Sequence, residues 1–373
     1  MTRLLRQILI SALAVVAPIA AIGQEDVKLL TEVGFDTFFD NTEYTGTQLG
    51  RSETTFAARL SPKVGLRWSE KNSFVVGADI FANFGEQGKF LSKARPQLYY
   101  RFATPKVKAL AGIFDREELK GYYSEVFISD VNRFYENRLH GFMGQYAGER
   151  GHIELALDWC GMYSKEARER FCILSAGHLD ILKSGALYGG YALQVFHYAG
   201  SEQISGSVVD NIIVNPYIGS RFKAFFDFDI KLHAIVAMQR DRAVESGMHI
   251  PGGAMLQLRM EKCGIYLEEQ LYVGSQLMPY FYASPNPLFP QGYGADLYYG
   301  NPIFGTDTYW ESCCRAPQTV IDTRIGYSNN FFNDTLCLNA FVAVQCDGSA
   351  WGTRQMVELK VRLFKDFALD KRR

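Results

Sequence analysis

The sequence predicts an all-β protein: a transmembrane antiparallel meander β-barrel of about 16 strands, with short periplasmic turns and long extracellular loops. Three observations predict this class. The chain opens with an export signal, its residues alternate between apolar and polar with period two, and its connections alternate between short and long. An aromatic content of 14% with a mean hydropathy of −0.09 fits a sheet that has one lipid face and one wet face.

Residues 1–23 have the pattern of a signal peptide. Arg3 and Arg6 form a positive amino-terminal region, an apolar core follows, and small residues at positions 21–23 precede Gln24. The apolar core is shorter than the roughly 17–25 residues that a membrane-spanning helix needs. We therefore predict that residues 24–373 form one exported barrel domain in the cell outer membrane.

The final candidate strand shows the period-two alternation most clearly. One face carries Val357, Leu359, Val361 and Leu363. The opposite face carries Glu358, Lys360 and Arg362. Successive side chains of a strand point to opposite sides, so such a segment has one dry and one charged face. The same alternation recurs along the chain and predicts strands rather than helices.

Sixteen segments qualify as strands. In chain order they are 31–40, 52–68, 73–84, 95–103, 107–115, 138–146, 152–160, 169–178, 186–199, 207–222, 226–238, 249–260, 265–273, 316–328, 335–345 and 352–364. Every second connection is short and turn-like, at 69–72, 104–106, 147–151, 261–264 and 329–334. Between these lie longer connections, above all 116–137 and 274–315. This segregation of loop lengths is typical of outer-membrane barrels with both termini in the periplasm.

Several stretches also resemble a known group of proteins. They are Val33-Gly34-Phe35-Asp36-Thr37-Phe38-Phe39-Asp40-Asn41-Thr42-Glu43-Tyr44, Val64-Gly65-Leu66-Arg67-Trp68, His197-Tyr198-Ala199-Gly200-Ser201, Val208-Val209-Asp210-Asn211, Pro251-Gly252-Gly253 and Leu277-Met278-Pro279-Tyr280. Together they resemble porin-like outer-membrane barrels of Bacteroides-type bacteria. The resemblance implies a surface-located barrel that is often assumed to be a porin, and it brings no established catalytic residues. The chain departs from the usual barrel ending, because a tail to Arg373 follows Phe367.

A barrel of about 16 strands is wide enough to leave an aqueous lumen. By parity, the candidate pore-lining residues are Arg67, Arg101, Lys108, Asp227, Asp229, Lys231, Arg259, Glu261, Arg324, Glu358, Lys360 and Arg362. These charges either create a transverse field that orients solutes at a constriction or pair with one another along a solvated wall. Both interpretations stay open, and the balance of signs predicts no ion selectivity.

The connection 274–315 is rich in aromatic residues, which argue against disorder. Its candidate substrate-binding residues are Tyr280, Tyr282, Tyr293, Tyr298, Tyr299 and Trp310. In one hypothesis this loop folds into or over the barrel mouth and offers rings on which sugars stack. In the other, the rings pack together as a rigid cap. Residues 116–137 are the second candidate for an inward fold, and would place Glu117, Glu118, Asp130 and Arg133 at the constriction.

Catalytic chemistry leaves no local signature in this sequence. It contains no GxSxG, HExxH, P-loop or CxxC motif, and its six histidines are scattered without metal-ligand spacing. We therefore predict no catalytic residues, no metal, no cofactor and no enzymatic activity. Among seven cysteines, Cys160 and Cys172 flank one hairpin loop and are the pair best placed for a disulfide.

Two functions remain in contention at this point. The first is a porin-like channel for passive diffusion of small hydrophilic solutes, with a bias toward sugars. The alternative is a non-conducting surface barrel that acts as a binding or scaffold component of an outer-membrane complex. The expected partners are outer-membrane lipid and small solutes, with a homo-oligomer left open. A net charge of −1 predicts no nucleic-acid partner.

Overall fold

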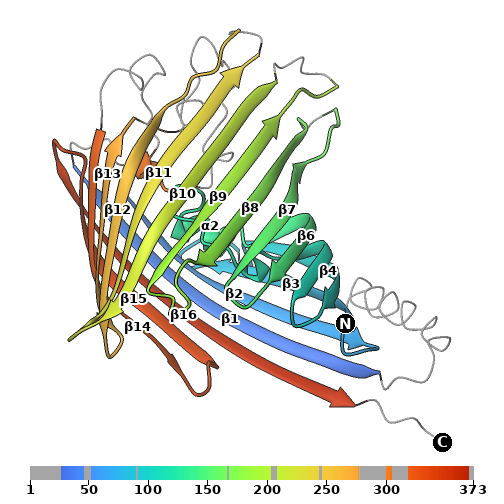
Figure 1. Ribbon diagram of the computed structural model, residues 1–373. Coiled ribbons are helices and arrows are strands. Elements are labelled where there is room, and N and C mark those ends of the chain that lie inside the picture. Colours follow the sequence, from blue (N-terminus) through green and yellow to red (C-terminus); the bar gives the residue numbers. More distant parts are fainter. Residues whose placement is uncertain are drawn as a thin grey trace, which may run out of the picture.

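The computed structural model describes residues 27–45, 52–89, 91–165, 168–202, 208–242, 246–275, 277, 300–304 and 318–368. These residues form a closed barrel of sixteen antiparallel strands (Figure 1). Each strand pairs with its neighbours in the chain, and β1 pairs with β16 to close the ring. The predicted fold class is confirmed. The segments 1–23 and 369–373, on which the signal peptide and the basic tail were predicted, lie outside the described residues.

The predicted strands correspond to the observed strands one for one. Their bounds are β1 (Lys28–Tyr44), β2 (Glu53–Arg67), β3 (Asn72–Asn83), β4 (Lys93–Ala103), β5 (Val107–Asp115), β6 (Arg138–Ala147), β7 (Gly151–Gly161), β8 (Arg170–Asp180), β9 (Leu187–Tyr198), β10 (Val209–Lys223), β11 (Asp227–Asp241), β12 (Gly252–Lys262), β13 (Ile265–Gly274), β14 (Gln318–Phe331), β15 (Leu336–Cys346) and β16 (Trp351–Ala368). The closing strands β1 and β16 extend further than their alternation predicts, because they pair with each other over their full length.

The strand register separates the two faces as the alternation predicts. On β16, Arg354 and Met356 are 3% and 2% exposed and point into the barrel. Val357 and Leu363, on the other parity, are 42% and 56% exposed on the outer surface. Closure satisfies the hydrogen bonds of every strand edge, which a sheet in lipid requires because the hydrocarbon core offers no water.

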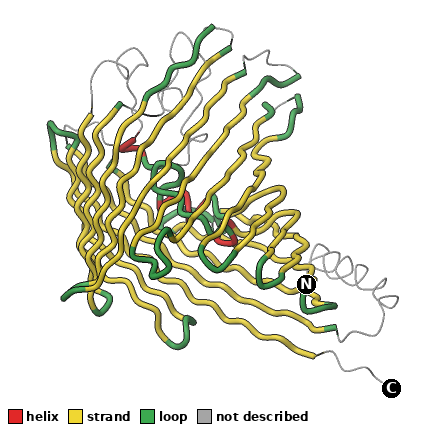
Figure 2. Tube along the Cα trace, in the orientation of Figure 1, coloured by secondary structure: helices red, strands yellow, loops and turns green. Residues whose placement is uncertain are grey.

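One connection folds back inside the ring of strands (Figure 2). Residues 116–137, called the insert below, contain the 3-10 helix η2 (Arg116–Glu118) and the α-helix α2 (Asp130–Tyr135). The Ser129 hydroxyl caps α2 by accepting a hydrogen bond from the backbone N–H of Asn132 at 3.2 Å. The alternation analysis predicted no helix here, because six residues are too few to show a helical period. Within the part of the chain that the structure describes, no helix is both long and apolar enough to cross a membrane.

The topology places loops and turns at opposite ends of the barrel. An epitope tag inserted at Gly88, between β3 and β4, should be labelled on intact cells, whereas one at Lys71, between β2 and β3, should be labelled only after permeabilisation. Labelling of both tags on intact cells would contradict this orientation.

The outer face of β14 offers a matched test of lipid exposure. Ile325 is 62% exposed in the middle of the strand, and Asn329 lies on the same face near the periplasmic end. We expect Ile325→Arg to destabilise the folded barrel by about 2–4 kcal/mol and Asn329→Arg by about 0–1 kcal/mol, because the cost of arginine depends on depth. Urea titration of the heat-modifiable folded form measures both. Equal losses would show that the face is assigned wrongly.

Candidate functional site

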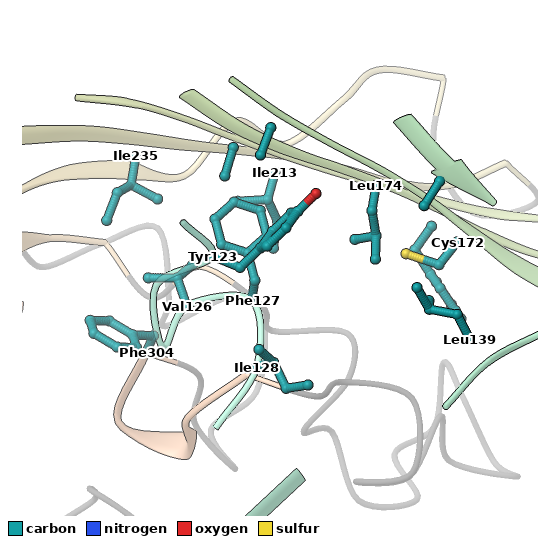
Figure 3. Close-up of a cluster of buried hydrophobic side chains, with 14 of the residues drawn as sticks. Tyr123, Val126, Phe127, Ile128, Leu139, Cys172, Leu174, Ile213, Ile235 and Phe304 are labelled. Atoms are coloured by element: carbon teal, nitrogen blue, oxygen red, sulfur yellow. The ribbon is translucent and has the colours of Figure 1, made fainter. Parts of the chain in front are cut away.

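The interior of the barrel has an apolar side. Tyr123, Val126, Phe127 and Ile128 of the insert pack against wall residues such as Leu174 (Figure 3). The other wall residues of this cluster in the close-up are Leu139, Cys172, Ile213 and Ile235. Burial of these side chains away from water holds the insert against β6 to β11.

A second connection reaches the same cluster. Ile303 and Phe304, in the 3-10 helix η4 (Pro302–Phe304), are each 1% exposed within it. The backbone N–H of Asn301 donates to the carbonyl oxygen of Glu125 in the insert at 2.7 Å. The described part of the long 274–315 loop therefore lies inside the barrel. Tyr280, Tyr282, Tyr293, Tyr298, Tyr299 and Trp310, the predicted substrate-binding residues, lie outside the described residues.

The opposite side of the insert is charged. Five of its carboxylates each form an ion pair with a cation on the wall. The pairs are Glu117 with Lys360 and Arg362, Glu118 with Lys108, Glu125 with Arg324, Asp130 with Arg354, and Glu136 with Arg95. These pairs reach β4, β5, β14 and β16, so the insert is held across the lumen.

Two of the wall arginines join the insert to carboxylates of the barrel itself. Arg354, whose side chain is 4% exposed, donates to Asp40 Oδ1 at 2.7 Å and to Asp130 Oδ2 at 3.0 Å. Arg324 lies 2.5 Å from Glu125 and 2.7 Å from Asp322. Because the side chains are buried, removing one member would leave its partners uncompensated in a low-dielectric interior.

Three cavities lie along the insert. The first, of about 150 Å³, lies between the insert and β7 to β9, and Glu117 and Lys360 contribute to its lining. The second, of about 240 Å³, also touches Glu117 and is lined by Arg59, Lys63 and Arg362. The third, of about 200 Å³, lies nearer the periplasmic ends of β1 to β4. The second and third share the residues Glu32, Lys63 and Glu118.

Glu117 lies where the first two cavities meet. Its carboxylate is 3.2 Å from Lys360 Nζ and 3.4 Å from Arg362 Nη2. Burial alone would raise the pKa of the Glu117 carboxyl, but the charges of Lys360 and Arg362 lower it to about 2. The stabilising effect of this charge is therefore complete above the ordinary carboxyl pKa of about 4.5 and is lost progressively as the pH falls from there toward about 2.

The structure brings many of the predicted pore-lining residues to this site. Lys108, Arg324, Lys360 and Arg362 pair with the insert, and Glu358 lies 3.1 Å from Lys360. Arg67 and Arg101 line the third cavity, where Arg67 also pairs with Asp366. These residues lie where parity placed them, while their role in conduction stays a proposal.

The remaining predicted residues lie away from the three cavities. Asp229 contacts Lys231 at 3.5 Å and Arg221 at 3.2 Å on the wall of β10 and β11. Arg259 pairs with Glu261 and Glu268 between β12 and β13. Asp227 lies at the periplasmic hairpin, where it pairs with the exposed Lys223. The contacts of these residues match the second interpretation of the sequence, in which neighbouring charges pair with one another along the wall.

Sequence reasoning missed part of the charged wall. Asp36, Arg59, Asp79 and Arg138 are buried ion-pair partners inside the barrel, yet none was a candidate. Parity along β2 was the available signal, because Arg59 and Lys63 share a face with the predicted Arg67.

The predicted disulfide is absent from the structure. No disulfide joins Cys160 to Cys172. In the pairing of β7 with β8, Cys172 lies opposite Asp158, and Cys160 lies within the register shift between Asp158 and Gly161 rather than opposite Cys172. Among the described residues, no group of three or more His, Cys, Asp or Glu side chains is arranged to hold a metal ion.

Comparisons with known proteins give a family and a fold. A family model described as lipid A 3'-O-deacylase-type matches residues 23–292, which is more than half of the chain. No curated protein matches the chain. The prediction of no enzymatic activity is wrong as a statement about the family, because the matching family is named after an enzyme. Sequence motifs missed this because barrel sites are assembled across strands.

Solved outer-membrane proteins share the fold. A loop-deletion variant of OmpT, an outer membrane protein of Vibrio cholerae, is similar with a TM-score of 0.54 and 7% identity over 91% of this chain and 100% of that chain. OccK11 (OpdR) of Pseudomonas aeruginosa has a TM-score of 0.51 and 9% identity over 92% of this chain and 98% of that chain. The expected porin-like outer-membrane barrel is confirmed.

The buried ion pairs of the insert should carry stability. We expect Arg354→Met to destabilise the barrel by about 3–5 kcal/mol, because Asp40 and Asp130 lose their shared cation. Lys223→Met removes one member of an exposed pair and should cost at most about 1 kcal/mol. Urea unfolding measures the free energy of unfolding of both variants. A loss for Arg354→Met as small as that for Lys223→Met would mean that the ion pairs of Arg354 are solvated.

Proposed function

The chain belongs to the lipid A 3'-O-deacylase-type family, and we propose that it forms a constricted outer-membrane channel for passive diffusion of small hydrophilic solutes. The observation that carries this proposal is a series of three neighbouring cavities that share charged lining residues, Glu117 between the first and second and Lys63 between the second and third. Sixteen strands leave room for an aqueous lumen, and the insert narrows it without occupying these spaces.

The proposed narrow point has charges of both signs facing each other. Glu117 of the insert faces Lys360 and Arg362 of β16, while Arg59 and Lys63 of β2 line the adjoining space. Such a ring favours small polar solutes that replace lost hydration by hydrogen bonds to charged groups. A sugar preference stays a prediction, since the loop aromatics that suggested it lie outside the described residues.

Substitutions at Glu117 test the channel. Wild-type protein in planar bilayers should conduct, Glu117→Ala should raise the single-channel conductance by widening the junction, and Glu117→Trp should lower it. Glu136→Ala is the matched control, because Glu136 also pairs with a wall arginine but lines none of the three cavities.

Silence of the folded wild-type protein and of Glu117→Ala would contradict the channel. That result would favour the non-conducting binding or scaffold barrel, which the many ion pairs of the insert also accommodate.

A second candidate function is ester hydrolysis on lipid A, and the family match is the observation that favours it. In this reaction water adds to the carbonyl carbon of an acyl ester, and the bond from that carbon to the sugar oxygen breaks. A fatty acid and a sugar hydroxyl are released. The chemistry is compatible with conduction, because the substrate lies in the outer leaflet and the cavities lie inside the barrel.

Hydrolysis is tested with purified folded protein and lipid A in mixed micelles. Mass spectrometry should show lipid A that has lost one acyl chain, together with an equal amount of free fatty acid. Heat-unfolded protein is the control. Unchanged lipid A with folded protein would remove this candidate and leave the channel untouched.

A further inference from the structure

The outer surface carries a polar and aromatic row at the extracellular ends of five adjacent strands. This rim row consists of Trp159, Phe171, His197, Asp210 and Arg240, from β7, β8, β9, β10 and β11 respectively. Each residue lies within two positions of the extracellular end of its strand. The inward neighbours Val209 and Gln239 are 1% and 0% exposed, so Asp210 and Arg240 are on the lipid side of the wall.

The rim row is continuous across the strands. The rings of Trp159 and Phe171 stack at 5.3 Å, and those of Phe171 and His197 stack at 4.8 Å. His197 is the cross-strand partner of Asp210, which is the partner of Arg240. Stacked rings at one end of a lipid-facing surface mark the level of the membrane–water interface.

Two guanidinium groups share one carboxylate at the end of this row. Arg240 Nη2 donates to Asp210 Oδ2 at 3.0 Å, and Arg242 donates to both oxygens of Asp210 at 2.7 Å. The group therefore keeps one positive charge in excess, and the Arg242 side chain that carries part of it is 51% exposed.

At the periplasmic end of β10 and β11, the exposed ion pair has no excess of positive charge. There Lys223 pairs with Asp227, one cation to one carboxylate. On the outer face of these two strands, the pair of guanidinium groups on one carboxylate thus lies at the extracellular end.

Directly below the rim row lies a continuous apolar row. Its members, linked strand to strand by the register, are Leu157, Ile173, Val195, Ile212 and Met238. A molecule that fits both rows has an anionic head at the level of the guanidinium groups and acyl chains beneath it. Arginine suits a phosphate head in particular, because a guanidinium that is bound to a carboxylate keeps further charged N–H donors for a phosphate oxygen.

We propose that Arg240 and Arg242 form a docking site on the outer wall for the phosphate group of an acylated glycolipid in the outer leaflet. The stacked rings of Trp159, Phe171 and His197 extend the site along the sugar headgroup. The site is separate from the cavities inside the barrel and does not depend on conduction. The proposal rests on the second candidate function, hydrolysis of lipid A, and gives the lipid a place to bind. Binding can be measured whether or not the lipid is hydrolysed.

The test measures binding of bisphosphorylated lipid A to full-length barrels in detergent micelles, with the same lipid after phosphatase treatment as comparison. The double variant Arg240→Gln/Arg242→Gln should bind the phosphorylated lipid at least about ten-fold more weakly than wild type, because two charged hydrogen-bond donors are lost. The control Lys183→Gln/Lys223→Gln removes the same charge at the periplasmic turns and should bind as wild type does.

Three results would overturn the proposal. They are undiminished binding by the Arg240/Arg242 variant, equal binding of the dephosphorylated lipid by wild type, and displacement of the lipid by millimolar inorganic phosphate. The first would mean that Arg240 and Arg242 do not hold the phosphate. The second would mean that the barrel binds the lipid without using its phosphate, and the third would mean that the site takes a free anion. Heat modifiability of each variant verifies that it folds, and a null hydrolysis assay would not bear on any of these outcomes.

Discussion

The interior of this barrel depends on ion pairs between the insert and the wall. Five carboxylates of the insert are matched by cations of four strands, and the two arginines Arg324 and Arg354 extend the pairs to carboxylates of the wall. A buried charge without a partner is costly, so the insert and the strands fix each other's positions. The cavities, the constriction and the proposed route for solutes all follow from where the insert is held.

The insert also shows how an exported barrel can have a core. The outside of the barrel is apolar because it faces lipid, so burial on that side comes from the membrane. Inside, Tyr123, Phe127 and Phe304 belong to one apolar cluster, and Phe134 of the insert packs with Phe38 of β1 in a second one. The insert is thus anchored by apolar contacts on both sides, and the charged spaces lie beside them.

Family and fold constrain the function in different ways. The family match concerns an activity on a lipid, whereas the similarity to solved outer-membrane proteins at 7–9% identity concerns the arrangement of strands alone. The two are compatible on one molecule, since a barrel has two independent surfaces. The inner wall faces the lumen, and the outer wall, with Arg240 and Arg242 at its rim, faces lipid.

The sequence by itself determined the strands and their faces. Alternation such as Val357 to Leu363 is local, because each side chain's side of the sheet follows from its parity. Loop length and aromatic content likewise made residues 116–137 the second candidate for an inward fold, after 274–315. Only the tertiary structure decided which charges meet, since partners such as Asp40 and Arg354 lie 314 residues apart. Their contact requires closure of the ring and a particular strand register. Neither closure nor register can be read from the alternation of apolar and polar residues. The rim row needed the same register, which aligns single residues from five strands that no short motif connects.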